Sequence, residues 1–157
     1  MKIQRRFTRE GESPYEGLEF ETRKSVIRNP DGTVVSKWDQ VVVPKQWSQV
    51  ATDIMAQKYF RKAGIPKHHK PAKEKDIPSW LQASVLDQSK QSKLSADERS
   101  TSETDAREVF HRLAGCWTYW GFKYGYFDSE QDARALYDEL CHMLANQMTA
   151  PNSPQWF

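Results

Sequence analysis

The chain has few cysteines, little excess charge and no long apolar run. Its 157 residues include two cysteines, Cys116 and Cys141, whose positions form no disulfide framework, so we expect a reducing, cytoplasmic environment. The 23 lysines and arginines nearly balance the 21 aspartates and glutamates, which leaves no bulk charge for binding nucleic acid. No apolar segment is long enough to span a bilayer, and no apolar run follows the basic N-terminus as in a signal peptide. A soluble protein without a membrane partner is expected.

Patterns for metal or phosphate binding are also missing. The sequence has no Cys-x-x-Cys pair and no glycine-rich phosphate loop. Cys116 and Cys141 fall on apolar faces of predicted helices, which favours small core residues over metal ligands. We therefore expect no metal site. The aromatic run from Trp117 to Phe127 could line a ligand site, but its helical spacing favours the core.

The composition suits one domain with a modest core, because 38% of the residues are hydrophobic and 12% are aromatic. Residues 1–45 are expected to form an N-terminal arm and a β-hairpin. The arm, Met1 to Tyr15, has no clear period and is predicted to become ordered only against a partner surface. Strands are predicted at Phe20–Arg28 and Thr33–Val43, because Asn29-Pro30-Asp31-Gly32 between them is a hairpin turn signal.

Residues 46–71 are expected to form the first helix and a basic loop. Apolar residues at helical spacing predict a helix over Trp47–Ala63, with Gly64 as its C-terminal stop. The basic stretch from Lys67 to Lys75 could contact phosphate. Because no aromatic residues are interleaved for stacking, a solvated connection is the better interpretation, and no direct nucleic-acid binding is expected.

Residues 72–104 are rich in lysine, serine, glutamine and aspartate, which predicts a flexible connection with one short helix. Residues 105–149 are expected to form a helical pair. Thr104 is the candidate cap of the first helix, Gly121 should break that helix, and Ser129 is the candidate cap of the second. The expected fold class is therefore mainly α with a small N-terminal β-hairpin, an α+β arrangement.

The last eight residues depart from the helical pattern. Pro151 and Pro154 prevent helix continuation, because proline lacks the amide donor and biases the residue before it toward extended geometry. An extended segment is predicted, and its two aromatic residues, Trp156 and Phe157, should be buried by a continuation of the chain. Taken alone, Asn152-Ser153-Pro154 is a turn whose side chains can cap the local backbone.

Motifs along nearly the whole chain resemble, in order, those of one enzyme family. They include Arg5-Arg6-Phe7-Thr8, Ile27-Arg28-Asn29-Pro30-Asp31-Gly32, Trp47-Ser48-Gln49-Val50-Ala51, Leu113-Ala114-Gly115-Cys116-Trp117, Gly125-Tyr126-Phe127-Asp128-Ser129 and Ala150-Pro151-Asn152-Ser153-Pro154-Gln155-Trp156-Phe157. Together they look like the N-terminal region of adenosylcobalamin-dependent (class II) ribonucleotide reductases, ending at the start of the catalytic barrel. Residues 150–157 resemble the residues that lead into that barrel, here truncated.

The resemblance implies a helical N-terminal region ahead of a ten-stranded α/β barrel. It implies a ribonucleoside-diphosphate reductase that makes deoxyribonucleotides for DNA synthesis by thiyl-radical chemistry, with adenosylcobalamin as cofactor of the full-length enzyme. The catalytic cysteines would lie beyond Phe157, so this chain holds no catalytic residue and is not expected to bind the cofactor alone. Only Ser153 is carried over, as a contact to the ribonucleotide substrate. The other implied partners are the remainder of the reductase polypeptide and, in a homodimer, a second copy of the full enzyme.

A second hypothesis is a free-standing, non-catalytic interaction module. In that case the basic loop at Lys67–Lys75 would bind an anionic partner, and the chain would have a self-sufficient terminus. The aromatic pair Trp156 and Phe157 at the terminus favours the reductase hypothesis instead, because large aromatic side chains at a free end call for a covering surface.

The isolated 157-residue chain is predicted to be inactive. Supplied with adenosylcobalamin, a ribonucleoside diphosphate and a dithiol, it should form no deoxynucleotide, because the thiol that would carry the radical is absent. Chromatographic assay of the product checks this, with a full-length class II reductase as the positive control. Product that persists after removal of contaminating reductase would contradict the expectation that the catalytic cysteines lie outside this chain.

Overall fold

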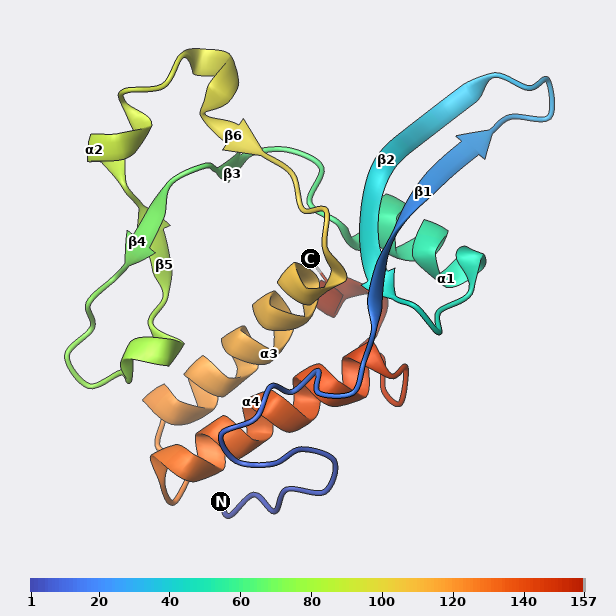
Figure 1. The fold of residues 1–157 in the computed structure, drawn as a ribbon. Coiled ribbons are helices and arrows are strands. Elements are labelled where there is room, and N and C mark those ends of the chain that lie inside the picture. The colour runs from blue at the N-terminus through green and yellow to red at the C-terminus, as the bar shows by residue number, and fades with distance from the viewer. Residues whose placement is uncertain (157) are drawn as a thin grey trace.

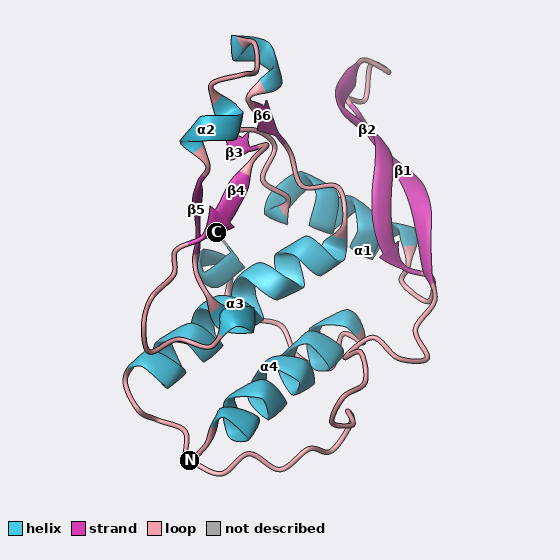
Figure 2. Ribbon diagram, turned by 60° about the vertical axis from the view of Figure 1, so that its left-hand side comes forward, coloured by secondary structure: helices cyan, strands magenta, loops and turns pink. Residues whose placement is uncertain are grey.

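The computed structural model describes residues 1–156. Its centre is an antiparallel pair of helices, α3 (Ala106–Lys123) and α4 (Glu130–Ala145), which lie side by side in both views (Figure 1, Figure 2). A long β-hairpin and helix α1 (Gln49–Ile54) lie at one end of this pair, and a ribbon of short strands arches away from α3 (Figure 1). The described residues thus form a small mixed domain with one hairpin and four α-helices. None of these helices is long and apolar enough to cross a membrane.

The β-hairpin forms where the sequence predicts it. Strands β1 (Phe20–Arg28) and β2 (Val34–Pro44) pair antiparallel. In the turn, the Gly32 amide donates to the carbonyl three residues earlier at 2.9 Å, with Gly32 at φ +86°. Glycine adopts this conformation without the Cβ strain that other residues would suffer. At the other end of the hairpin Val41 and Val43 are fully buried, so the base of the hairpin belongs to the core.

The first helix is shorter than predicted. Helix α1 begins after Ser48, its N-cap, and widens into a π-helical turn over Met55–Tyr59. The prediction of Gly64 as its stop is wrong, because the chain is diverted earlier. The backbone of Arg61 is paired with Glu103: its N–H donates to the Glu103 carboxylate at 2.8 Å, and its carbonyl accepts from the Glu103 N–H at 2.9 Å. Engaged in this way, Arg61 is unable to continue the helix.

The stretch 72–104, expected as a flexible connection, contains regular structure. The predicted short helix is a single 3-10 turn, Ser79–Leu81, with Leu81 buried. Side chains also hold the backbone, since the Gln82 amide donates to the carbonyls of Glu74 and Ile77 at 2.8 and 2.6 Å. Ladders this short leave no clear periodicity in the sequence. The strands and the α-helix of this stretch are β5 (Ser84–Leu86), helix α2 (Gln88–Gln91) and β6 (Ser100–Thr101). Strand β5 pairs with β4 (His69–Pro71), and β6 pairs with β3 (Ile65–Pro66), both of which precede the stretch.

Both long helices form as predicted, with two corrections. The cap of α3 is Asp105 and not Thr104, because the Asp105 carboxylate accepts from the backbone at the positive end of the helix and forms a capping box with the third helical residue. Gly121 lies inside α3 and does not break it. A Cβ at this glycine would lie 2.7 Å from the Phe127 ring, so its small size permits close packing. Ser129 caps α4, as predicted.

The core joins the base of the hairpin, α1 and the facing sides of α3 and α4. Part of the predicted aromatic core is wrong: Trp120, Tyr124 and Tyr126 are 53%, 68% and 59% exposed, because they lie at the end of α3 away from the hairpin. Cys141 is buried, as predicted, whereas Cys116 is exposed. The buried core comprises Val41, Val43, Trp47, Met55, Ala56, Phe60, Ala106, Val109, Phe110, Leu113, Ala114, Cys141, Leu144, Ala145 and Trp156, with Trp117 half-buried against it.

The N-terminal arm packs on α4 of the same chain, which corrects the expectation of a partner surface. The backbone N–H of Thr8 donates to the Glu139 carboxylate at 2.8 Å, and the Thr8 hydroxyl donates to the same oxygen at 2.7 Å. Arg5 forms an ion pair with Asp138 at 2.8 Å, and the Asp138 side chain is only 2% exposed. Acidic side chains of α4 therefore supply the acceptors that a neighbouring strand would otherwise provide.

Acidification should weaken the attachment of the arm through Glu139. Burial alone would raise the pKa of this carboxyl, but hydrogen bonds from Thr8 and Phe7 hold the pKa below its ordinary value. A carboxylate with a depressed pKa contributes its full stability above the unfolded-state pKa of about 4.3. That contribution is lost as the pH falls through the lower folded-state pKa.

The variant Glu139→Gln should lower the free energy of unfolding by about 1–3 kcal/mol at neutral pH, because several donors lose a charged acceptor. It should also flatten the loss of stability below about pH 5. Urea titrations over a pH series measure both effects, with Glu16→Gln as the control at an exposed acid. The same acid sensitivity in wild type and Glu139→Gln would show that Glu139 does not hold the arm.

Candidate functional site

The residues after α4 form a tight turn on the surface of the domain. The predicted extended segment is instead a single 3-10 turn, Ser153–Trp156. The backbone N–H of Gln155 donates to the backbone carbonyl of Asn152 at 2.9 Å, and the side-chain oxygen of Gln155 accepts from the backbone N–H of Asn152 at 3.2 Å. Helix α4 has already ended at Ala145, and Gln147 turns the chain with a φ of 56°, so Pro151 follows the end of the helix and does not cause it. We refer to residues 150–156 as the C-terminal segment.

Trp156 attaches the C-terminal segment to the domain. Its side chain is 7% exposed and stacks on Tyr59, with ring centroids 4.6 Å apart and an interplanar angle of 24°. Its indole N–H donates to the Pro151 carbonyl at 2.9 Å, which closes the turn on itself. The expectation that a continuation of the chain would bury Trp156 is therefore corrected, since Tyr59 and its neighbours cover it. The same expectation for Phe157 lies outside the described residues.

A buried ion pair lies under this turn. Arg112 of α3 donates to both carboxylate oxygens of Glu103, from Nε at 2.9 Å and from Nη2 at 3.1 Å. It also donates to the Tyr59 carbonyl at 3.0 Å and to the Trp156 carbonyl. The two charged side chains are only 14% and 6% exposed. We call Glu103, Arg112, Tyr59 and Trp156 the Arg112 cluster.

Ser153, the predicted substrate contact, begins the turn and is exposed to solvent. It lies three residues before Trp156, whose ring stacks on Tyr59 and whose carbonyl accepts from Arg112. Sequence reasoning proposed Ser153 as a substrate contact, which its exposed position does not test, and it did not single out Glu103 or Arg112. The signal that could have found them is a charged residue, Arg112, between the buried positions Phe110 and Leu113 of an apolar helix.

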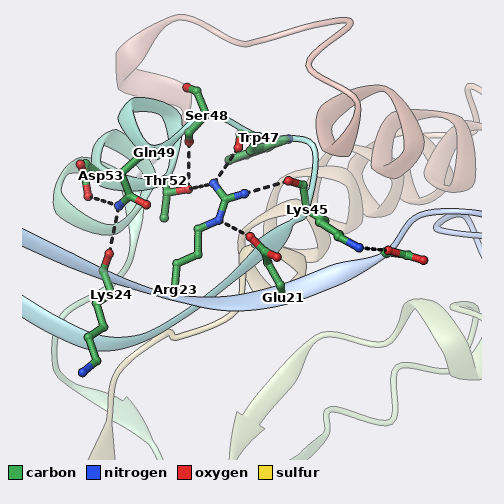
Figure 3. A network of polar contacts seen from close by, with 10 residues as sticks. Glu21, Arg23, Lys24, Lys45, Trp47, Ser48, Gln49, Thr52 and Asp53 are labelled. Carbon is green, nitrogen blue, oxygen red and sulfur yellow. Dashed lines mark hydrogen bonds and ion pairs between the residues drawn. The ribbon is translucent and has the colours of Figure 1, made fainter.

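A second arginine network fixes the helix that carries Tyr59. Figure 3 shows the Arg23 guanidinium of β1 surrounded by acceptors from β1 itself, from the loop between β2 and α1, and from α1. It donates to Glu21 at 2.6 Å, to the Trp47 carbonyl at 2.6 Å, to the Thr52 hydroxyl at 3.0 Å and to the Lys45 carbonyl at 2.8 Å. All of these acceptors belong to the protein, so the network joins the hairpin to α1 and has a structural role.

A cavity of about 800 Å³ lies beside α3, between this helix and the short strands. His111 lines it, and its Nδ1 lies 2.7 Å from the Tyr137 hydroxyl, while burial lowers the pKa of the imidazole. Cys116, although exposed, also lines it, and its partial desolvation raises the pKa of the thiol, which disfavours the reactive thiolate at neutral pH. Within residues 1–156, no three or more histidine, cysteine or acidic side chains gather in a group that could hold a metal ion.

The basic loop predicted at Lys67–Lys75 is divided between β4 and a turn, and its lysine side chains are exposed. An exposed lysine keeps its hydration, as expected of a solvated connection. The residue with positive φ in this stretch is Lys73, at φ 58°, which places it in a tight bend and not along a continuous basic face. The arrangement gives no support for a docking site built on this loop.

Comparison with known proteins decides between the two hypotheses. A family model described as class II vitamin B12-dependent ribonucleotide reductase matches residues 21–147. The chain belongs to this family. It corresponds to the N-terminal region of a class II reductase, as the sequence motifs indicate.

Three relatives are described as vitamin B12-dependent ribonucleotide reductases. The proteins from Bradyrhizobium diazoefficiens and Agrobacterium fabrum are 58% and 57% identical over 157 residues, which is 100% of this chain and 12% of each relative. The protein from Rhodopirellula baltica is 28% identical over 148 residues, or 94% of this chain and 11% of the relative. This class II reductase chain therefore spans about an eighth of the length of the curated relatives it matches. The family model stops before Ser153, so it does not test the role of that residue.

Trp156→Ala should destabilise the domain by about 3–5 kcal/mol, because it removes a buried aromatic side chain and its stack on Tyr59. Trp120→Ala is the matched control, since Trp120 is 53% exposed, and it should cost less than about 1 kcal/mol. Urea unfolding followed by far-ultraviolet circular dichroism measures both values. Equal losses would mean that Trp156 does not attach the C-terminal segment to the domain.

Proposed function

We propose that this chain is the N-terminal segment of a vitamin B12-dependent ribonucleoside-diphosphate reductase, which supplies deoxyribonucleotides for DNA synthesis in the cytoplasm. The observation that carries the proposal is the family match, together with 57–58% identity to named reductases along the whole chain. In this proposal residues 150–157 lead into the catalytic barrel. Thiyl-radical chemistry takes place on cysteines in the remainder of the polypeptide, because Cys116 and Cys141 lie on helices α3 and α4, a context that matches no catalytic cysteine of the family.

The described residues do not fit adenosylcobalamin. A corrin macrocycle with its nucleotide tail is much larger than the drug-sized ligands for which a cavity of about 800 Å³ is suited. Inside that cavity, the Nδ1 atom of His111 is already engaged by Tyr137. We therefore assign the cofactor to the remainder of the polypeptide.

The role of this chain in substrate binding rests on Ser153. Its hydroxyl can donate and accept a hydrogen bond, and it is exposed at the start of the Ser153–Trp156 turn. Pro154 follows it directly and Pro151 precedes it by two residues, so the local backbone has little conformational freedom left to lose. These features support a direct contact between the Ser153 hydroxyl and the ribonucleotide. A homodimer of the full enzyme, expected from the resemblance, stays a prediction.

Steady-state kinetics of a full-length reductase tests this role. Ser153→Ala should lower kcat/KM for the ribonucleoside diphosphate by a loss of about 1–3 kcal/mol, the range expected for a hydrogen bond to a charged or polar substrate group. The matched control is Gln155→Ala, which removes the side-chain acceptor of the same turn but keeps the Ser153 hydroxyl. Unchanged kcat/KM in Ser153→Ala, with a lowered melting temperature in both variants, would show that Ser153 is only a turn residue.

A further inference from the structure

The Arg112 cluster holds the C-terminal segment at two points. The first is the Trp156 carbonyl, which accepts from Arg112 Nη1, and the second is the Trp156 ring, which stacks on Tyr59 at 4.6 Å. The indole N–H closes the turn by donating to the Pro151 carbonyl at 2.9 Å. A closed turn fixed through its last residue has few remaining degrees of freedom, so the position of Ser153 depends on Arg112.

The acid of the cluster is fixed independently of Arg112. One Glu103 oxygen accepts from the Arg61 backbone N–H at 2.8 Å, and the Glu103 N–H donates to the Arg61 carbonyl at 2.9 Å. Glu103 therefore presents an already oriented carboxylate to the guanidinium. With both charges buried, the pair is neutral as a unit, and Arg112 is engaged with protein acceptors and not directed at an anionic substrate.

The fork shape of the guanidinium is needed for this arrangement. Arg112 reaches three separate acceptors in different directions: the Glu103 carboxylate, the Tyr59 carbonyl and the Trp156 carbonyl. An ammonium group at this position would be a point charge, and its donors could not span all three acceptors at once. Lysine would keep the positive charge but would reach only some of these three acceptors.

We infer that Arg112, oriented by Glu103, is a positioning residue for substrate binding: it sets the location of Ser153 through the carbonyl and ring of Trp156. This inference rests on the proposed contact between Ser153 and the ribonucleotide. It assigns no contact between Arg112 and the substrate. The pair acts on the reaction only by holding the C-terminal segment in one conformation.

The test uses a full-length reductase carrying Arg112→Lys or Arg112→Gln, each alone and combined with Ser153→Ala. The matched control is Arg107→Gln, because Arg107 lies on the same helix and pairs with Asp105, at the start of α3 and outside the C-terminal segment. Two quantities are measured: the amide hydrogen exchange rate of peptides that cover residues 150–157, and kcat/KM for the ribonucleoside diphosphate.

The expected result is at least about tenfold faster exchange in residues 150–157 for Arg112→Gln, a smaller increase for Arg112→Lys, and no change for Arg107→Gln. Arg112→Gln should also lower kcat/KM about tenfold in the wild-type background but less than about twofold in the Ser153→Ala background. Such non-additivity means that the two residues act through one contact. If Arg112→Gln does not fold, the Arg112→Lys pair of variants gives the same comparison.

Three results would overturn the inference. Unchanged exchange in residues 150–157 would show that Arg112 does not hold the segment. Faster exchange with unchanged kcat/KM, or losses in kcat/KM that add fully to those of Ser153→Ala, would leave Arg112 a purely structural residue. A failure of the proposed function is distinguishable, because it appears as unchanged kcat/KM in the Ser153→Ala variant alone, whatever the exchange rates are.

Discussion

The buried pair between Arg112 and Glu103 is the interaction on which the arrangement of this domain depends most. Burying two charges is costly, and the cost is offset only when the donors and acceptors of both groups are satisfied. Here the guanidinium bonds the Glu103 carboxylate and two backbone carbonyls, and the carboxylate also accepts from the Arg61 amide. The pair thereby joins the end of the first helix, the link between β6 and α3, α3 itself and the C-terminal segment. Removing either charge would leave its partner buried and unpaired.

Charged side chains of the helical pair hold both the N-terminal arm and the C-terminal segment. On one side, Glu139 and Asp138 of α4 bind the N-terminal arm through its backbone amides and Arg5. On the other side, α3 carries Arg112 and holds the C-terminal segment. Both ends are thus fixed by charged groups on rigid helices and not by the apolar core alone. Groups on packed helices are positioned more precisely than groups on free loops, so both segments are held in defined positions.

Local signals made part of this fold predictable, and long-range contacts account for what was missed. The hairpin and the Ser129 cap follow from a turn motif and a capping residue, which act within a few positions. By contrast, Thr8 meets Glu139 across 131 positions and Arg112 meets Trp156 across 44, and no periodicity reports such pairings. Periodicity placed Phe110 on the buried face of α3 but does not show where the covering elements stop, so Trp120 was assigned to the core although it is 53% exposed. Ser153 was predicted from the family resemblance. The Arg112 cluster that holds it consists of residues far apart in the sequence, so only the three-dimensional structure reveals it.

The decisive measurement is a structure of the full-length reductase with a ribonucleoside diphosphate bound. The Ser153 hydroxyl should lie within hydrogen-bond distance of the nucleotide, at about 3 Å, while Trp156 remains stacked on Tyr59 and its carbonyl remains bonded to Arg112. A nucleotide bound well beyond that distance from Ser153, or a Trp156 released from Tyr59 and Arg112 in the complete enzyme, would contradict it.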